Sequence, residues 1–177
     1  MPREKVTKPY VNNKEFLEHM IKYRNNVLEA ENSGRERPRV PTYIGTAIMK
    51  IATHLSHKPN FINYTFREEM ISDGIENCLQ YIDNFNPDKS KNPFAYFTQI
   101  IYFAFIRRIQ KEKKNLYIKY KMSENVNVFD QTSAKIKGDT KSYNDEIKYG
   151  EWSKEYMKDF ITTFETNKRR KRIRKRV

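Results

Sequence analysis

Apolar residues recur along most of this chain at intervals of three and four, the spacing that places them on one face of an α-helix. Four stretches have this pattern: 14–30, 44–57, 65–82 and 93–123. The period-two alternation of a half-buried strand is hard to find. The pattern therefore predicts an all-α protein built as a helical bundle.

Local signals mark the ends of these helices. The segment 32–41 contains a glycine and two prolines, so the first helix is expected to end before it. Thr65 and Glu68 have the spacing of a capping box, in which each side chain bonds to a free backbone amide of the first turn. Asn92 followed by Pro93 predicts the start of the fourth helix, because proline is favoured at the first helical position.

Two small residues of the third stretch predict tight packing. Gly74 lies inside a helix, where glycine costs about 1 kcal/mol relative to alanine, so we expect another helix to approach it closely. Cys78 is the only cysteine of the chain, which excludes an intramolecular disulfide. Because its neighbours Ile75 and Leu79 are apolar, we expect a buried thiol in a reducing compartment.

Helical spacing weakens after the fourth stretch. Residues 123–142 are polar and lack periodicity, which predicts a linker between a helical domain at 1–122 and a C-terminal segment at 143–177. That segment has aromatic residues near four-residue spacing and then a basic tail. The aromatic residues are Trp152, Tyr156, Phe160 and Phe164. We expect this basic C-terminal extension to be partly disordered or weakly helical.

The charge of the chain indicates which class of partner it binds. The formal net charge is +13 and the isoelectric point is about 9.7. Eight basic and no acidic residues occupy 168–176, which leaves +5 for residues 1–167. A basic surface of this kind indicates nucleic acid. With no signal peptide and no apolar run near the roughly 18 residues of a membrane helix, we expect a soluble, intracellular protein without a membrane partner.

The fourth stretch combines aromatic rings with cations. Its basic residues can neutralise phosphates, and they are Arg107, Arg108, Lys111, Lys113 and Lys114. Upstream, Tyr96, Gln99, Ile100 and Phe103 follow one helical edge. The two rings offer stacking surfaces for unpaired bases, and Gln99 can pair with an adenine edge. The alternative is that the residues of this edge belong to the core. We expect a core position for four other residues of the same helix: Phe97, Ile101, Ala104 and Phe105.

No pattern typical of an enzyme occurs. There is no HExxH pair, CxxC pair or phosphate-binding glycine loop, so we expect a binding protein with no cofactor, metal or catalytic residue. Four acidic residues, Glu68, Glu69, Asp73 and Glu76, share one helix. They leave three interpretations open: a solvated face, a docking surface, or magnesium ligands of a helical nuclease.

The order of these elements resembles region 2 of the bacterial sigma factors. Residues 79–85 (LQYIDNF) correspond to the family's KAVDKF-like helix end, and 94–101 (FAYFTQII) correspond to its aromatic STYATWW-type motif. The chain is also similar to the late-transcription sigma factors of T-even bacteriophages. That similarity covers about residues 10–121, at 10–15, 44–49, 69–76 and 91–99 (KNPFAYFTQ).

This resemblance implies a transcription initiation factor acting in the bacterial host cytoplasm. It implies that Glu69, Ser72, Asp73 and Glu76 bind a coiled-coil of the largest subunit of core RNA polymerase. It also implies that the aromatic helix recognises and melts an A·T-rich late promoter element, TATAAATA-like. The residues so assigned to DNA are Tyr96, Gln99, Ile100, Phe103, Arg107, Arg108, Lys111 and Lys114.

The chain departs from the family at two places, the aromatic motif and the C-terminus. Gln99 and Ile100 stand where the general family has paired tryptophans. The phage factors end in an apolar-acidic hook for the sliding clamp and act with a late co-activator, whereas this chain ends in KRRKRIRKRV. A basic accessory protein for DNA or RNA, with no polymerase contact, is the main alternative.

Overall fold

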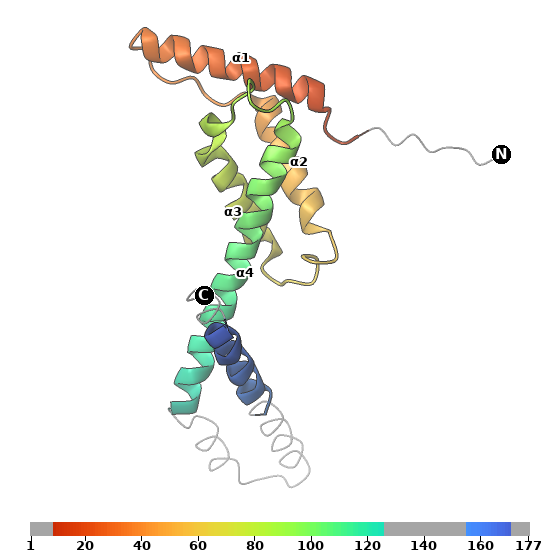
Figure 1. Cartoon of the computed structure of the whole chain (residues 1–177), viewed down its shortest axis with the longest axis vertical. Helices are drawn as coiled ribbons and strands as arrows, with labels where there is room; N and C mark the ends of the chain where they lie inside the picture. Colours follow the sequence, from red (N-terminus) through yellow and green to blue (C-terminus); the bar gives the residue numbers. More distant parts are fainter. Residues whose placement is uncertain (1–8, 126–154, 171–177) are drawn as a thin grey trace, which may run out of the picture. The chain divides into compact units, whose positions relative to one another are not determined.

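The computed structural model describes residues 9–125 and 155–170 of the 177-residue chain. All regular structure in these residues is helical, which confirms the predicted all-α class (Figure 1). The elements are α1 (Asn13–Asn32), α2 (Thr42–Ser56), α3 (Arg67–Gln80), the 3-10 turn η1 (Ile82–Asn84), α4 (Pro93–Asn125) and a helix over 155–170. Each predicted helical stretch coincides with one of them.

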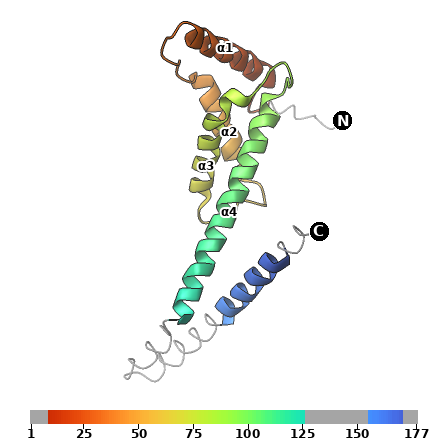
Figure 2. The same ribbon diagram turned by 60° about the vertical axis from the view of Figure 1, so that its left-hand side comes forward.

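The chain divides into two compact units, residues 1–109 and 110–177. The division lies inside α4, upstream of the expected linker at 123–142. Residues 126–142 of that linker, with 143–154 and 171–177, lie outside the described residues. In the first unit, α1 lies across one end of α2, α3 and the first half of α4 (Figures 1 and 2).

The core of the first unit is apolar and largely aliphatic. From α2, three isoleucines are at most 1% exposed: Ile44, Ile48 and Ile51. Phe16 of α1 is fully buried and stacks on Phe97 of α4, with ring centroids 5.5 Å apart. Because burying each large side chain contributes about 1.5–3 kcal/mol, these helices stabilise one another more than each stabilises itself.

Helices α3 and α4 approach closely at Gly74, as the sequence predicts. A β-carbon built there would lie 3.1 Å from Cγ2 of Ile101 and 3.1 Å from Cε1 of Phe105. One turn further on, Cys78 is fully buried, and burial raises the pKa of its thiol to about 12. The thiol is therefore neutral near pH 7 and behaves as a small apolar side chain.

The ends of the helices follow local backbone chemistry, with one correction. Asn92 Oδ1 accepts the Ala95 N–H at 3.0 Å, which confirms the predicted start of α4. The capping box at Thr65 and Glu68 is wrong: α3 begins after Phe66, and no side chain caps it. The rings of Tyr64 and Phe66 pack against the core instead, with centroids 5.1 Å apart. Packing, not a hydroxyl cap, determines where α3 begins.

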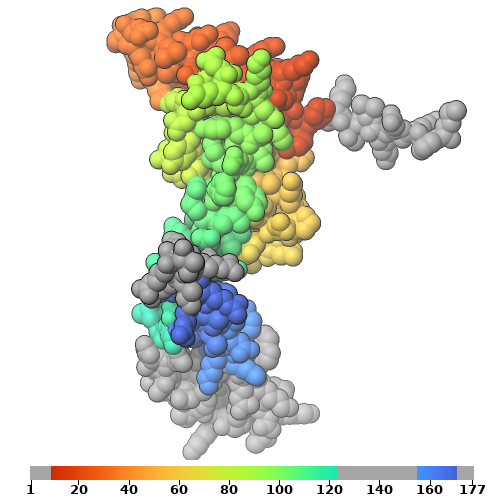
Figure 3. Space-filling model, in the orientation of Figure 1, coloured from red at the N-terminus to blue at the C-terminus, as the bar shows by residue number. Residues whose placement is uncertain are grey.

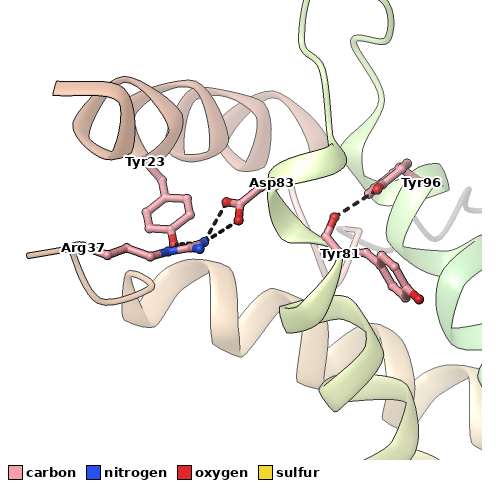
Figure 4. A network of polar contacts seen from close by, with 5 residues as sticks. All are labelled: Tyr23, Arg37, Tyr81, Asp83 and Tyr96. Atoms are coloured by element: carbon pink, nitrogen blue, oxygen red, sulfur yellow. Dashed lines mark hydrogen bonds and ion pairs between the residues drawn. The ribbon is translucent and has the colours of Figure 1, made fainter. Parts of the chain in front are cut away.

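Side chains from α1 and the loop after it hold the connection between α3 and α4. Arg24 Nη1 donates to the Phe85 carbonyl at 2.9 Å, and Asn13 Oδ1 accepts the Phe94 N–H at 3.2 Å. Arg37 Nη2 donates to both carboxylate oxygens of Asp83, at 2.7 and 2.6 Å (Figure 4). Since that pair is about half exposed, its contribution is small, on the order of 1 kcal/mol or less.

The second unit is described as a pair of helical segments. Tyr117 of α4 stacks on Phe164, with centroids 4.6 Å apart, and Tyr120 meets the edge of Phe160 at 5.5 Å. Higher numbers on α4 meet lower numbers on 155–170, so the segments are antiparallel. The predicted C-terminal helix is confirmed for these residues, while Trp152 lies outside them. No described helix has the length and apolarity needed to cross a membrane.

Two glycines test the close approach of α3 and α4. We expect Gly45→Ala in α2 to raise the free energy of unfolding by about 0.5–1 kcal/mol, because nothing lies within 4 Å of its β-carbon. Gly74→Ala should gain the same propensity but lose about 1–3 kcal/mol to crowding. Urea denaturation of both variants measures the difference. Equal stabilisation by the two alanines would contradict the close approach.

Candidate nucleic-acid interface

The first half of α4 has one buried and one exposed face. The predicted core residues Phe97, Ile101, Ala104 and Phe105 are at most 2% exposed. Four residues on the opposite side are exposed: Gln99, Tyr102, Phe103 and Arg107. In the space-filling view, no other helix covers this part of α4 on the side facing the reader (Figure 3). We call these four residues the ring face. A stable helix therefore presents aromatic rings outward.

The structure separates the residues that the sequence placed on one edge. Gln99 and Phe103 belong to the ring face, but Tyr96 and Ile100 are partly buried and pack against the core. The Tyr96 hydroxyl donates to the Tyr81 carbonyl at 3.0 Å (Figure 4). Burial also raises the pKa of Tyr96. Tyr96 thus ties α4 to the end of α3, and only part of its ring is available to a ligand.

Sequence reasoning missed Tyr102. Its ring is 40% exposed beside Phe103 at 49%, and the two rings meet edge to face with centroids 5.8 Å apart. On its other side Tyr102 meets the edge of Phe61 at 5.7 Å, and Phe61 is buried. A helical wheel drawn from Gln99 would have found it, because Tyr102 lies three residues further and next to Phe103.

The two arginines of α4 both reach α3. Arg107 Nη2 donates to Asn77 Oδ1 at 2.7 Å, and Arg108 Nη1 lies 3.4 Å from Asp73 Oδ2. Arg107 is exposed, whereas Arg108 is partly buried. The other predicted cations, Lys111 and Lys114, belong to the second unit and are exposed.

The acidic residues of α3 form a separate exposed surface. Glu69, Ser72 and Glu76 are exposed at three- and four-residue spacing, which places them on one helical face. Leu79 continues this line and is 42% exposed, although it is one of the apolar neighbours from which a buried Cys78 was predicted. Asp73 is partly buried through its pair with Arg108. The acidic surface therefore consists of Glu69, Ser72, Glu76 and Leu79, bordered by Asp73.

The described residues contain no group of three or more His, Cys, Asp or Glu side chains placed to hold a metal ion. Glu68 is also exposed on α3, but it forms no such group with Glu69, Asp73 and Glu76. The arrangement of these acids therefore adds no support to the nuclease interpretation.

No protein-family model matches this chain, and no curated protein matches it in sequence at a significant level. Any assignment of function therefore depends on the residues and contacts described above.

Two tyrosines of α4 differ in one hydrogen bond and so provide a matched test. We expect Tyr96→Phe to lower the free energy of unfolding by about 0.5–1.5 kcal/mol, because the Tyr81 carbonyl loses one of its two donors and keeps only the Asn84 N–H. Tyr102→Phe removes a hydroxyl for which the described residues offer no hydrogen bond, and should change stability by less. Chemical denaturation measures both variants. Equal losses would argue against Tyr96 as the tie between α3 and α4.

Proposed function

We propose that this chain is a sigma-like transcription initiation factor that binds core RNA polymerase and engages unpaired bases of an A·T-rich late promoter element, TATAAATA-like. The observation that carries the proposal is the ring face: Tyr102 and Phe103 project outward from a helix whose other side is buried. The sequence resemblance to sigma region 2 places the family's melting helix at this same segment.

Exposed rings on a rigid helix suit the capture of separated strands. Each base that stacks on an aromatic ring gains about 1–3 kcal/mol, whatever its identity. Gln99, on the same face, has an amide that can donate to and accept from an adenine edge. A·T steps are the least costly to unpair, so a site that only traps unpaired bases favours them. Selectivity then comes from melting together with Gln99.

The cations near this face supply backbone contacts. Arg107 is exposed and its acceptor Asn77 carries no charge, so a phosphate can compete for the guanidinium. Arg108 is already paired with Asp73. A partner cation that binds Asp73 would weaken that pair and make Arg108 more available to DNA. In this way, docking and DNA contact are coupled through the ion pair of Arg108 and Asp73.

The acidic surface of α3 is the proposed polymerase contact. Glu69, Ser72 and Glu76 are exposed together, and the family resemblance assigns them to the coiled-coil of the largest subunit. Leu79 adds an apolar contact at one end. The proposal places the protein in the host bacterial cytoplasm and gives it no catalytic role. A late co-activator and the sliding clamp are expected partners by resemblance alone, and the basic C-terminus departs from the family's clamp hook.

A basic accessory protein is the second candidate, and the excess of exposed lysine favours it. The two candidates differ in what polymerase adds. The accessory function predicts the same DNA preference with and without core polymerase. The sigma-like function predicts that preference for the late promoter appears only in the complex.

Charge reversal tests docking. We expect Glu69→Lys with Glu76→Lys to reduce retention on immobilised core polymerase by at least about tenfold, because like charges at an interface cost several kcal/mol. Asp73 is left intact because its pair with Arg108 belongs to the fold. The control, Glu18→Lys with Glu31→Lys on exposed sites of α1, makes the same charge change and should bind normally. Equal retention of both variants would refute the docking surface.

Removing the rings tests strand capture. We expect Tyr102→Ala with Phe103→Ala to keep polymerase binding but abolish run-off transcription and thymine reactivity to permanganate on an A·T-rich late promoter. The loss of stacking, about 1–3 kcal/mol per base, is the physical reason. The control, Leu28→Ala with Met49→Ala, removes equally exposed apolar side chains from α1 and α2 and should open the promoter. Promoter opening by the ring variant would overturn the proposal.

A further inference from the structure

The second unit carries most of the excess charge of the chain. Residues 110–177 hold 19 of the 35 Lys and Arg residues and 10 of the 22 Asp and Glu residues, a net charge of +9. Residues 1–109 hold the remaining +4. The smaller unit is therefore the more basic one, although the ring face and the acidic surface both belong to the larger unit.

The described cations of this unit point to solvent. Seven are exposed and form no ion pair with any residue of 9–125 or 155–170: Lys111, Lys113, Lys114, Lys158, Lys168, Arg169 and Arg170. One acid of the returning helix is used internally. Glu165 accepts from the Tyr117 hydroxyl at 2.8 Å and lies 3.9 Å from Lys121 Nζ. Pairing of the two helical segments thus occupies a carboxylate, while the seven cations named above stay exposed.

An aromatic clasp joins the two segments. Tyr117 with Phe164 and Tyr120 with Phe160 are its ring pairs. The clasp holds 155–170 against α4, so that cations from two segments remote in sequence belong to one compact unit. A helix dipole favours cations in a last turn. This dipole effect does not account for all eight basic residues over 168–176, because it extends only over the last turn of a helix.

We propose that the second unit is a separate module that binds the phosphate backbone of duplex DNA without reading its sequence. Five of the seven exposed cations are lysines, a residue depleted from protein–protein interfaces and common in phosphate contacts. Duplex DNA has one charge per about 1.7 Å of its axis, the dense and regular target that dispersed cations can match. The module functions whether or not the chain docks on polymerase.

The test measures binding of the full chain to a random-sequence duplex as salt is varied, with no polymerase present. We expect Lys168→Gln, Arg169→Gln and Arg170→Gln together to weaken binding at least about tenfold. The slope of log affinity against log salt should flatten by about 0.9 for each phosphate that the variant no longer neutralises. The control, Lys14→Gln, Lys22→Gln and Lys50→Gln, removes three exposed cations from the first unit and should keep the slope. Equal slopes for the two variants would overturn the proposal.

A second variant separates the folded module from a simple polycation. Phe160→Ala with Phe164→Ala opens the clasp without altering charge, and we expect at least about threefold weaker binding, with circular dichroism confirming that the first unit stays helical. Wild-type affinity in this variant would refute the module. Binding to poly-glutamate or to single strands as tight as to duplex DNA would refute the choice of ligand. Neither result depends on the sigma-like function, because no polymerase or promoter is used.

Discussion

The first unit depends on the close approach of α3 and α4 at Gly74. With no side chain there, Ile101 and Phe105 can fill the space beside the α3 backbone. This contact fixes the rotation of α4 about its axis, because residues 101 and 105 must face inward. In a helix of 3.6 residues per turn, Phe103 then lies on the side of α4 opposite this contact, and Tyr102 lies about a quarter turn away from it. The outward direction of Phe103 thus follows from where a glycine lies on the neighbouring helix.

The same contact brings charges of opposite sign together. Once α4 lies against α3, Arg108 reaches Asp73 and Arg107 reaches Asn77. The sequence assigned Asp73 to one partner and Arg108 to another, but the fold pairs them with each other. Removal of one member of a partly buried ion pair destabilises the fold, because the other member is left as an uncompensated charge. A ligand that binds Asp73 or Arg108 in place of its present partner must therefore carry the charge that the partner supplied.

The sequence predicted the helices but not how they face one another. Apolar periodicity located α1 to α4, and Asn92 and Gly74 have the roles that their residue types suggest. The start of α3 differed because core packing of Phe66 outweighed a local cap at Thr65. Contacts between residues 30 or more apart, such as Arg107 with Asn77, have no local signal.

The ring face is an example of a feature that the sequence alone does not predict. Tyr96 and Tyr102 are both tyrosines on one helix, and spacing alone makes either a stacking surface. The Tyr96 hydroxyl donates to the Tyr81 carbonyl, whereas Tyr102 is 40% exposed and the described residues offer its hydroxyl no hydrogen bond. That carbonyl lies where α3 ends and η1 begins, and it also accepts the Asn84 N–H at 3.2 Å. Which tyrosine is tied down therefore depends on a contact between residues 15 apart in the chain, and the spacing of residues within α4 carries no signal of it.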